Sequence, residues 1–215
     1  FGDILAEGTR RAAEKIGKGS EQYAMQVKGM ELPGYDPRGA MALALNYATS
    51  NVGGNHCVGY SPMEIVGLPE PVDPFTTEKK GLLAKSNQDV VAIGETGIVC
   101  LFPLFFGMIP LELYGRMLST ITGVKEFSDE GFLLKLGERI WNLERMFNVR
   151  EGFGRKDDIL PVRFLKESLT EGNRAHHTVD LETMLDDYYR VRGWDVETGI
   201  PTEEKLKELN INVTV

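Results

Sequence analysis

The chain has 215 residues, of which 42% are hydrophobic and 26% are charged, so it can bury a substantial core. Its formal net charge of −8 disfavours nucleic acid and anionic membrane surfaces as partners. Two cysteines, Cys57 and Cys100, are too few for a disulfide-rich secreted scaffold. We therefore expect a globular protein of a reducing, cytoplasmic compartment whose partners are small molecules or proteins, with no nucleic acid and no membrane.

The N-terminal residues 3–17 have the apolar spacing of an amphipathic helix, which Gly17 and Gly19 end. The chain starts without Met and without the layout of a signal peptide, and it opens inside this pattern. We interpret it as a piece of something longer. The strongest apolar run, residues 98–110, is too short and too rich in Gly and Pro to span a bilayer.

Further helical patterns are separated by loops rich in Gly and Pro. Residues 39–50 are apolar on all sides and predict a buried helix between two such loops, residues 27–39 and 50–62. Additional helices are predicted over residues 79–101, 110–122, 128–148, 179–191 and 202–209. Because strand patterns are scarce, the predicted fold class is all-α.

Two of these segments carry further local signals. In residues 128–148 an apolar stripe recurs at steps of three and four, with Ser128 as a partial N-cap. The stripe consists of Phe132, Leu133, Leu136, Ile140, Leu143 and Phe147. Thr202 is a suitable start for the last helix.

Residue spacing alone identifies no chemistry. The chain has no catalytic triad, P-loop, GxGxxG, HExxH or CxxC pattern. The two Gly-rich loops around residues 39–50 are typical both of backbone that approaches a ligand and of ordinary joints between helices. On pattern alone both interpretations stand.

Five longer strings change this balance. They are KGMELPGYDPRG, NYATSNVGGNH, ETGIVC, NVREGFGRKDDILPVR and YYRVRGWDVETGIPTEEKLKELNI. Together they resemble the tungsten-containing aldehyde:ferredoxin oxidoreductases, in that family's order and at about its spacing. The resemblance implies an irregular helical bundle of that family's C-terminal type. Residues 1–24 would be the tail of the preceding helical domain, and residues 25–215 the C-terminal helical domain that covers the cofactor.

The resemblance also implies cofactors and a reaction. Members of the family hold tungsten between two pterins of the molybdopterin type, beside a [4Fe–4S] cluster. They oxidise aldehydes to carboxylic acids and pass electrons to ferredoxin. Because the full enzymes are much longer, we expect this chain alone to lack the N-terminal domains, to hold neither cofactor and to be inactive. Its uncovered face should be apolar or rich in glycine, which would favour a homo-oligomer.

Three residues acquire roles through the resemblance. Cys100 corresponds to the fourth cysteine ligand of the cluster, its alternative being a buried apolar thiol. Glu95 stands where the family has an aspartate that hydrogen-bonds the pterin, although its extra methylene moves the acceptor; the alternative is an exposed helix carboxylate. His56 matches a histidine beside tungsten that moves a proton or orients the substrate, its alternative being an ordinary surface histidine. Val58 replaces a basic residue usual in the family, and Cys57 is expected to have no ligand role.

Asp36 and Arg38 match the family's signature loop near the cofactor, with Gly39 opening the buried helix. A helix N-terminus can seat an anionic group, and arginine suits a phosphate. A capped helix start with an Asp–Arg pair explains the same residues equally well. The charged residues of a second string predict a structural network of ion pairs rather than cofactor contacts. They are Arg150, Glu151, Arg155, Asp157 and Asp158.

The leading hypothesis is therefore a fragment of a tungstopterin enzyme that oxidises aldehydes. An alternative within the family is a related tungsten enzyme that reduces another substrate, such as an aromatic acyl-CoA. A rival of another class is a non-catalytic helical interaction module built on the same scaffold.

Overall fold

The computed structural model describes residues 1–172 and 174–213. Apart from loops and one small sheet, the secondary structure of these residues is helical. The α-helices are α1 (Gly2–Ala6), α2 (Gly8–Ile16), α3 (Met41–Thr49), α4 (Pro62–Ile65), α5 (Lys80–Thr96), α6 (Phe102–Phe105), α7 (Leu111–Thr122), α8 (Glu130–Arg150), α9 (Val162–Lys166), α10 (Leu181–Arg192) and α11 (Glu203–Glu208). Short 3₁₀ turns cover Ser20–Tyr23, Pro37–Gly39, Lys125–Ser128 and Arg155–Asp157. Strands β1 (Gln26–Val27) and β2 (Met30–Glu31) pair antiparallel. The all-α prediction is confirmed.

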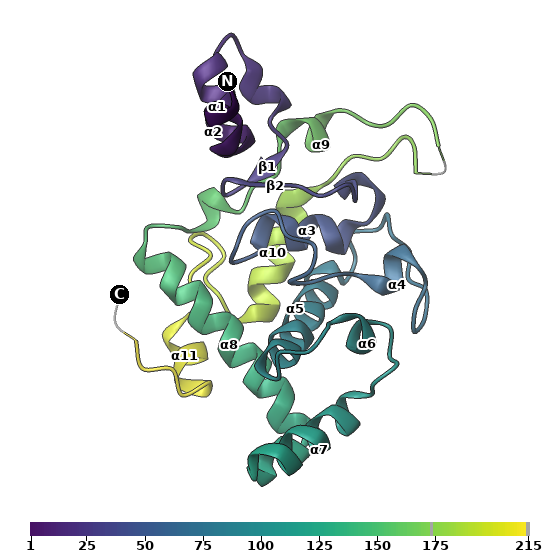
Figure 1. Cartoon of the computed structure of the whole chain (residues 1–215), viewed down its shortest axis with the longest axis vertical. Helices are drawn as coiled ribbons and strands as arrows, with labels where there is room; N and C mark the ends of the chain where they lie inside the picture. Colours follow the sequence, from purple (N-terminus) through teal and green to yellow (C-terminus); the bar gives the residue numbers. More distant parts are fainter. Residues whose placement is uncertain (173, 214–215) are drawn as a thin grey trace.

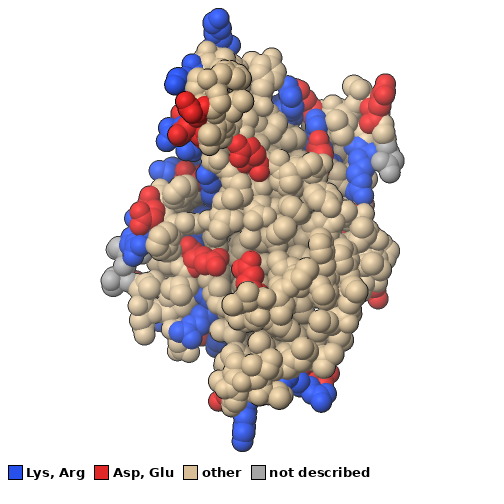
Figure 2. Space-filling model, in the orientation of Figure 1, with Lys and Arg blue, Asp and Glu red and all other residues tan. Residues whose placement is uncertain are grey.

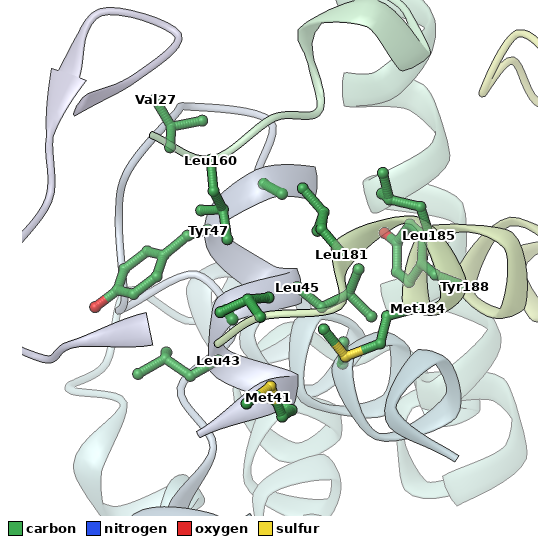
Figure 3. Close-up of a cluster of buried hydrophobic side chains, with 14 of the residues drawn as sticks. Val27, Met41, Leu43, Leu45, Tyr47, Leu160, Leu181, Met184, Leu185 and Tyr188 are labelled. Carbon is green, nitrogen blue, oxygen red and sulfur yellow. The ribbon is translucent and has the colours of Figure 1, made fainter. Parts of the chain in front are cut away.

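Helices α3, α5, α8 and α10 form the centre of the molecule (Figure 1). Every residue of α3 is buried, as its all-round apolar sequence predicted. Its Leu45 and Leu43 belong to one core cluster with Leu181 and Leu185 of α10 (Figure 3). Burying such side chains contributes about 1.5–3 kcal/mol each, so this cluster carries much of the stability of the fold.

Glycines allow α5 to approach both of its neighbours closely. A Cβ on Gly137 of α8 would lie 2.2 Å from the carbonyl oxygen of Asp89. One on Gly81 of α5 would lie 2.6 Å from the backbone nitrogen of Tyr188. No side chain fits at either position, so α5 is clamped between α8 and α10.

The N-terminal segment differs from the single helix predicted over residues 3–17. It consists of α1 and α2, because the backbone of Gly8 has a left-handed φ of 88° that ends the first helix. Glu31 of β2 then accepts hydrogen bonds from the backbone and hydroxyl of Thr9, both at 2.6 Å. In Figure 1 these two helices lie at one end of the molecule, beyond the hairpin. The predicted domain boundary after residue 24 stays a prediction.

The helix predicted over residues 79–101 also ends early, at Thr96. Gly97 is its C-cap, and Ile98 has a left-handed φ of 53°. Tyr114 of α7 packs at this end, and its hydroxyl donates to the carbonyl of Gly94 at 2.9 Å. A Cβ on Gly97 would lie 2.2 Å from that hydroxyl, so the chain turns away at this point.

Helix α8 turns a different side to the core than its apolar stripe predicted. Leu133 and Trp141 are buried, but Phe132, Leu143 and Phe147 are exposed by 40%, 48% and 56%. The side of α8 that faces the core also contains Gly137 and the buried polar residues Asn142 and Arg145. The N-cap is Asp129 rather than Ser128, and its carboxylate accepts from the backbone of Phe132 at 2.7 Å.

The surface shown in Figure 2 is mostly uncharged over its lower part, where α6 and α7 lie in the same view, and apart from a few acidic groups near the middle the charges gather at its edges. The segment between α5 and α7 has exposed apolar side chains, with Ile98 94%, Phe102 60% and Met108 71% exposed. Among the described residues, no helix combines the length and apolarity needed to cross a membrane.

Candidate active site

His56 lies half-buried in the loop that joins α3 to α4. Its ring packs against those of Tyr35 and Tyr60, with centroid distances of 5.2 Å and 6.2 Å, and the two tyrosine rings also contact each other. Burial lowers the pKa of His56, so its imidazole is neutral at pH 7 and can accept a proton. Burial and the neighbouring Tyr35 raise the pKa of Tyr60 to about 12, so this phenol keeps its proton.

Cys57 follows His56 directly in the loop. Cys57 is a free, exposed thiol whose Sγ is 3.5 Å from His56 Nε2. Burial and, to a smaller extent, the negative charge of Glu95 raise the pKa of the Cys57 thiol. Tyr60 of the same loop belongs to one hydrophobic cluster with Val91 of α5, so the loop packs against the helix that carries Glu95.

Glu95 is exposed in the last turn of α5. Partial desolvation raises the pKa of its carboxyl group, and no donor in the described part of the chain hydrogen-bonds to its carboxylate. A carboxylate left free in this way can accept hydrogen bonds from the NH-bearing edge of a pterin. The residue therefore fits the predicted contact, which stays a prediction.

Cys100 is a free, exposed thiol in the extended segment after α5, so the alternative of a buried apolar thiol is wrong. Across residues 1–172 and 174–213, no three His, Cys, Asp or Glu side chains are grouped closely enough to hold a metal. A [4Fe–4S] cluster needs four ligands, so Cys100 can supply one and the others must come from outside this chain. An accessible thiol on an apolar surface fits that role.

Asp36 and Arg38 form an intramolecular pair. The carboxylate of Asp36 accepts from Arg38 Nε and Nη2 at 2.9 Å and 2.6 Å, and Arg38 Nη1 donates to the carbonyl of Glu167 at 2.8 Å. Arg38 is 7% exposed, and its guanidinium lies 5.3 Å from the centroid of the Phe164 ring. This arrangement matches the Asp–Arg alternative at the helix start. A direct contact between these residues and a cofactor stays a prediction.

The N-terminus of α3 does not offer the open anion seat expected beside Gly39. The carboxylate of Glu64, which is 4% exposed, accepts from the backbone nitrogens of Ala42 and Leu43 at 3.0–3.3 Å. Lys80 donates to the same carboxylate at 2.5 Å. A side chain of the protein itself therefore occupies the position where a bound anion was predicted.

Two residues of the charged string near residue 155, Asp158 and Arg155, form ion pairs within the protein, as predicted. Asp158 is buried and paired with Arg145 and Lys28, while Arg155 pairs with Asp186 at 2.7 Å. Although burial opposes its ionisation, the two adjacent cations hold the pKa of Asp158 below its usual range. Two other members of the string, Arg150 and Glu151, form an exposed pair with each other.

Sequence reasoning missed the residues that surround His56. The rings of Tyr35 and Tyr60 pack against it, and the side chain of Asn46 donates a hydrogen bond to the backbone carbonyl of Asn55 in the same loop. Asn46 carried a signal that could have been used, because it is an amide in the middle of an otherwise apolar helix. Such a buried polar group requires a partner.

The sequence of this chain matches one family model and several known proteins. A family model described as "Aldehyde ferredoxin oxidoreductase, domains 2 & 3" matches residues 1–211. The chain is 45% identical to the tungsten-containing aldehyde ferredoxin oxidoreductase of Pyrococcus horikoshii and 46% identical to that of Pyrococcus abyssi. Each alignment covers 98% of this chain and 34% of the relative. The chain thus spans about a third of the length of these relatives.

One more distant relative and one solved structure also match this chain. The aliphatic sulfonate oxidoreductase, WOR-like subunit, of Pyrococcus furiosus is 32% identical, over 98% of this chain and 32% of that protein. Among solved structures, the active-site complex BamBC of benzoyl coenzyme A reductase, in complex with 1,5-dienoyl-CoA, matches with a TM-score of 0.68 at 22% identity. The match covers 98% of this chain and 36% of that one. At this identity the match shows a shared fold.

Proposed function

Because this chain belongs to the aldehyde ferredoxin oxidoreductase family, we propose that it is part of a tungstopterin enzyme that oxidises aldehydes to carboxylic acids with ferredoxin as electron acceptor. The observation that carries this proposal is the packing of the His56 loop against α5, the helix that bears Glu95 in its last turn. The loop presents a neutral imidazole, and the end of the helix presents an exposed carboxylate.

In this proposal Glu95 would hold the pterin of the tungsten cofactor, and Cys100 would supply one ligand of a [4Fe–4S] cluster. The bound groups supply two-electron oxidation at the metal and one-electron transfer through the cluster. The other cluster ligands and most of the pterin contacts would come from the part of the relatives' length that this chain does not span. On its own the 215-residue chain would then retain neither group.

His56 is the proposed acid–base residue. Conversion of an aldehyde and water into a carboxylic acid releases two electrons and two protons, and a neutral imidazole nearby can accept a proton during that change. The lowered pKa of His56 keeps the ring in its accepting form. The Tyr35 and Tyr60 rings restrict its orientation and shield it from bulk water.

Sequence identity ranks the substrate classes. The aldehyde enzymes share 44–46% identity with this chain over 98% of its length, against 32% for the sulfonate oxidoreductase subunit. Reduction of an aromatic acyl-CoA has only the shared fold behind it, because the benzoyl-CoA reductase match is 22% identical. We therefore place aldehyde oxidation first.

Metal analysis of the intact protein tests the proposal against a non-catalytic interaction module. After anaerobic purification we expect tungsten and iron together, and aldehyde-dependent reduction of ferredoxin. Aliphatic sulfonates and aromatic acyl-CoA thioesters serve as competing substrates in the same assay. Absence of tungsten, molybdenum and iron would contradict the enzyme assignment. A brown, paramagnetic preparation of the 215-residue chain alone would contradict the proposed need for the other domains.

A further inference from the structure

The loop that carries His56 rests on a fully buried amide, the side chain of Asn46 on α3. Asn46 Nδ2 donates to the backbone carbonyl of Asn55, the residue directly before His56, at 3.1 Å. On its other side, Asn46 Oδ1 accepts from Nε2 of Gln88 on α5 at 3.1 Å. Asn46 therefore connects the loop to the interior of the helical core.

The direction of these hydrogen bonds is fixed from inside the protein. Gln88 Oε1 accepts from Arg192 Nη2 and from the Tyr188 hydroxyl, both at 2.7 Å. Because a guanidinium can only donate, Gln88 must turn its oxygen toward Arg192 and its NH₂ group toward Asn46 and Thr49. Asn46 must then turn its own oxygen toward Gln88, which leaves its NH₂ group for the loop.

The loop side of this contact is equally constrained. The side chain of Asn55 accepts from the backbone nitrogen of Cys57 at 2.8 Å, so the residues on both sides of His56 are tied together. A Cβ added to Gly59 would lie 2.1 Å from Asn46 Oδ1 and 2.9 Å from Gln88 Cγ. The loop can therefore rest on the amide pair only with glycine at this position.

We propose that Asn46, oriented by Gln88 and Arg192, is a positioning residue that sets the backbone of His56 for proton transfer. This inference rests on the function proposed above for His56. The side-chain oxygen of Asn46 accepts from Gln88 and its nitrogen donates to Asn55, so Asn46 acts on His56 only through the loop. Its loss should therefore reduce turnover without changing how tightly the aldehyde binds.

Asn46→Asp in the intact, tungsten-loaded enzyme, assayed at a pH where the new carboxyl group is ionised, is the first test, because a carboxylate has no donor for Asn55 and keeps an acceptor for Gln88. Asn142→Asp is the matched control. Asn142 is also fully buried, but it bonds Trp194 and the carbonyl of Glu138, away from the loop. With aldehyde as substrate, we expect Asn46→Asp to lower kcat per bound tungsten by about tenfold or more and to change KM less than about twofold. Asn142→Asp should leave kcat per tungsten unchanged.

A double-mutant cycle separates positioning from general damage. If Asn46 works through His56, Asn46→Asp should have no further effect in a His56→Gln background. Gly59→Ala should reproduce the loss of kcat from the opposite side of the contact, and it replaces Asn46→Asp if that protein does not fold.

The outcomes are distinguishable. If the wild-type enzyme contains no tungsten or does not oxidise aldehydes, or if His56→Gln keeps full turnover, the function proposed above fails. If His56→Gln is impaired while Asn46→Asp and Gly59→Ala behave like Asn142→Asp, the positioning role of Asn46 alone is overturned. Additive effects of His56→Gln and Asn46→Asp would overturn it as well.

Discussion

Arg145 and Asp158 form a two-pronged ion pair in the interior, with Nη1–Oδ1 and Nη2–Oδ2 distances of 3.0 Å and 2.7 Å. Both side chains are completely buried. Lys28 adds a third charge at 2.9 Å from Asp158, and the Tyr189 hydroxyl donates to the same carboxylate at 2.6 Å. These contacts hold two segments against α8, which carries Arg145. They are the loop after α8, which contains Asp158, and the β1–β2 hairpin, which contains Lys28.

Replacement of Asp158 by Asn should cost about 3–5 kcal/mol of unfolding free energy at pH 7, because two buried cations lose their counter-charge. The pKa of Asp158 is lowered in the folded state, so its contribution is complete above the unfolded value of about 4 and is lost as the pH falls further. Urea unfolding of both proteins between pH 7 and pH 3 measures this. The gap between wild type and variant should shrink below about pH 4, and a constant gap would contradict the assignment.

Replacement of Gly137 by Ala should force α5 and α8 apart. The new methyl group would lie 2.2 Å from the backbone oxygen of Asp89, which no rotamer change can relieve. We expect a loss of about 1–3 kcal/mol or more in chemical denaturation. Gly2→Ala in α1 is the matched control, because nothing lies within 4 Å of its added Cβ, and its effect should stay below about 1 kcal/mol.

Replacement of His56 by Gln should lower kcat for aldehyde oxidation roughly 10²- to 10⁴-fold, the range typical of a lost acid–base residue. Because burial lowers the pKa of His56, the acidic limb of the wild-type pH profile should lie below the ordinary histidine value. The Gln variant should lose that limb. A pH profile that is the same in both proteins would assign the limb to another group.

Replacement of Cys100 by Ser in the intact protein should reduce the iron content and lower aldehyde oxidation by at least about tenfold, since serine is a poor cluster ligand. Cys57→Ser provides the control, because both thiols are free and exposed and only Cys100 lies in the segment after α5. Iron analysis and visible absorption after anaerobic purification compare the two. Equal iron in both variants would remove Cys100 from the ligand set.

The helices that the sequence predicted well are those whose signals are local. The uninterrupted apolar run of α3 has no alternative to burial, and Thr202 caps α11 by accepting from the backbone of Lys205 at 3.2 Å. The early end of α5 has a local signal in its C-cap, Gly97, but the contact between Gly94 and Tyr114, twenty residues apart, could not be predicted from the sequence. The apolar stripe of α8 failed for a similar reason, since Gly137 and Arg145 occupy the side that packs against the core.

The same distinction between local signals and long-range contacts applies to the candidate site. His56, Glu95 and Cys100 were reached through resemblance, and the structure adds that the His56 loop packs against α5, the helix that carries Glu95. The aromatic walls and the supporting Asn46 depend on contacts between segments far apart in the chain, which no spacing rule reveals. The anion expected at α3 is internal for the same reason, because Glu64 reaches the helix from α4.

That internal anion affects how the protein can be assembled. With Glu64 neutralising both the α3 terminus and Lys80, the central helix needs no phosphate or cofactor to complete its first turn. Under the function proposed above, this helical core would therefore fold without the cofactor, which would then bind to a surface that already exists. Starvation for tungsten should accordingly leave an apoprotein in which α3 remains protected from hydrogen exchange.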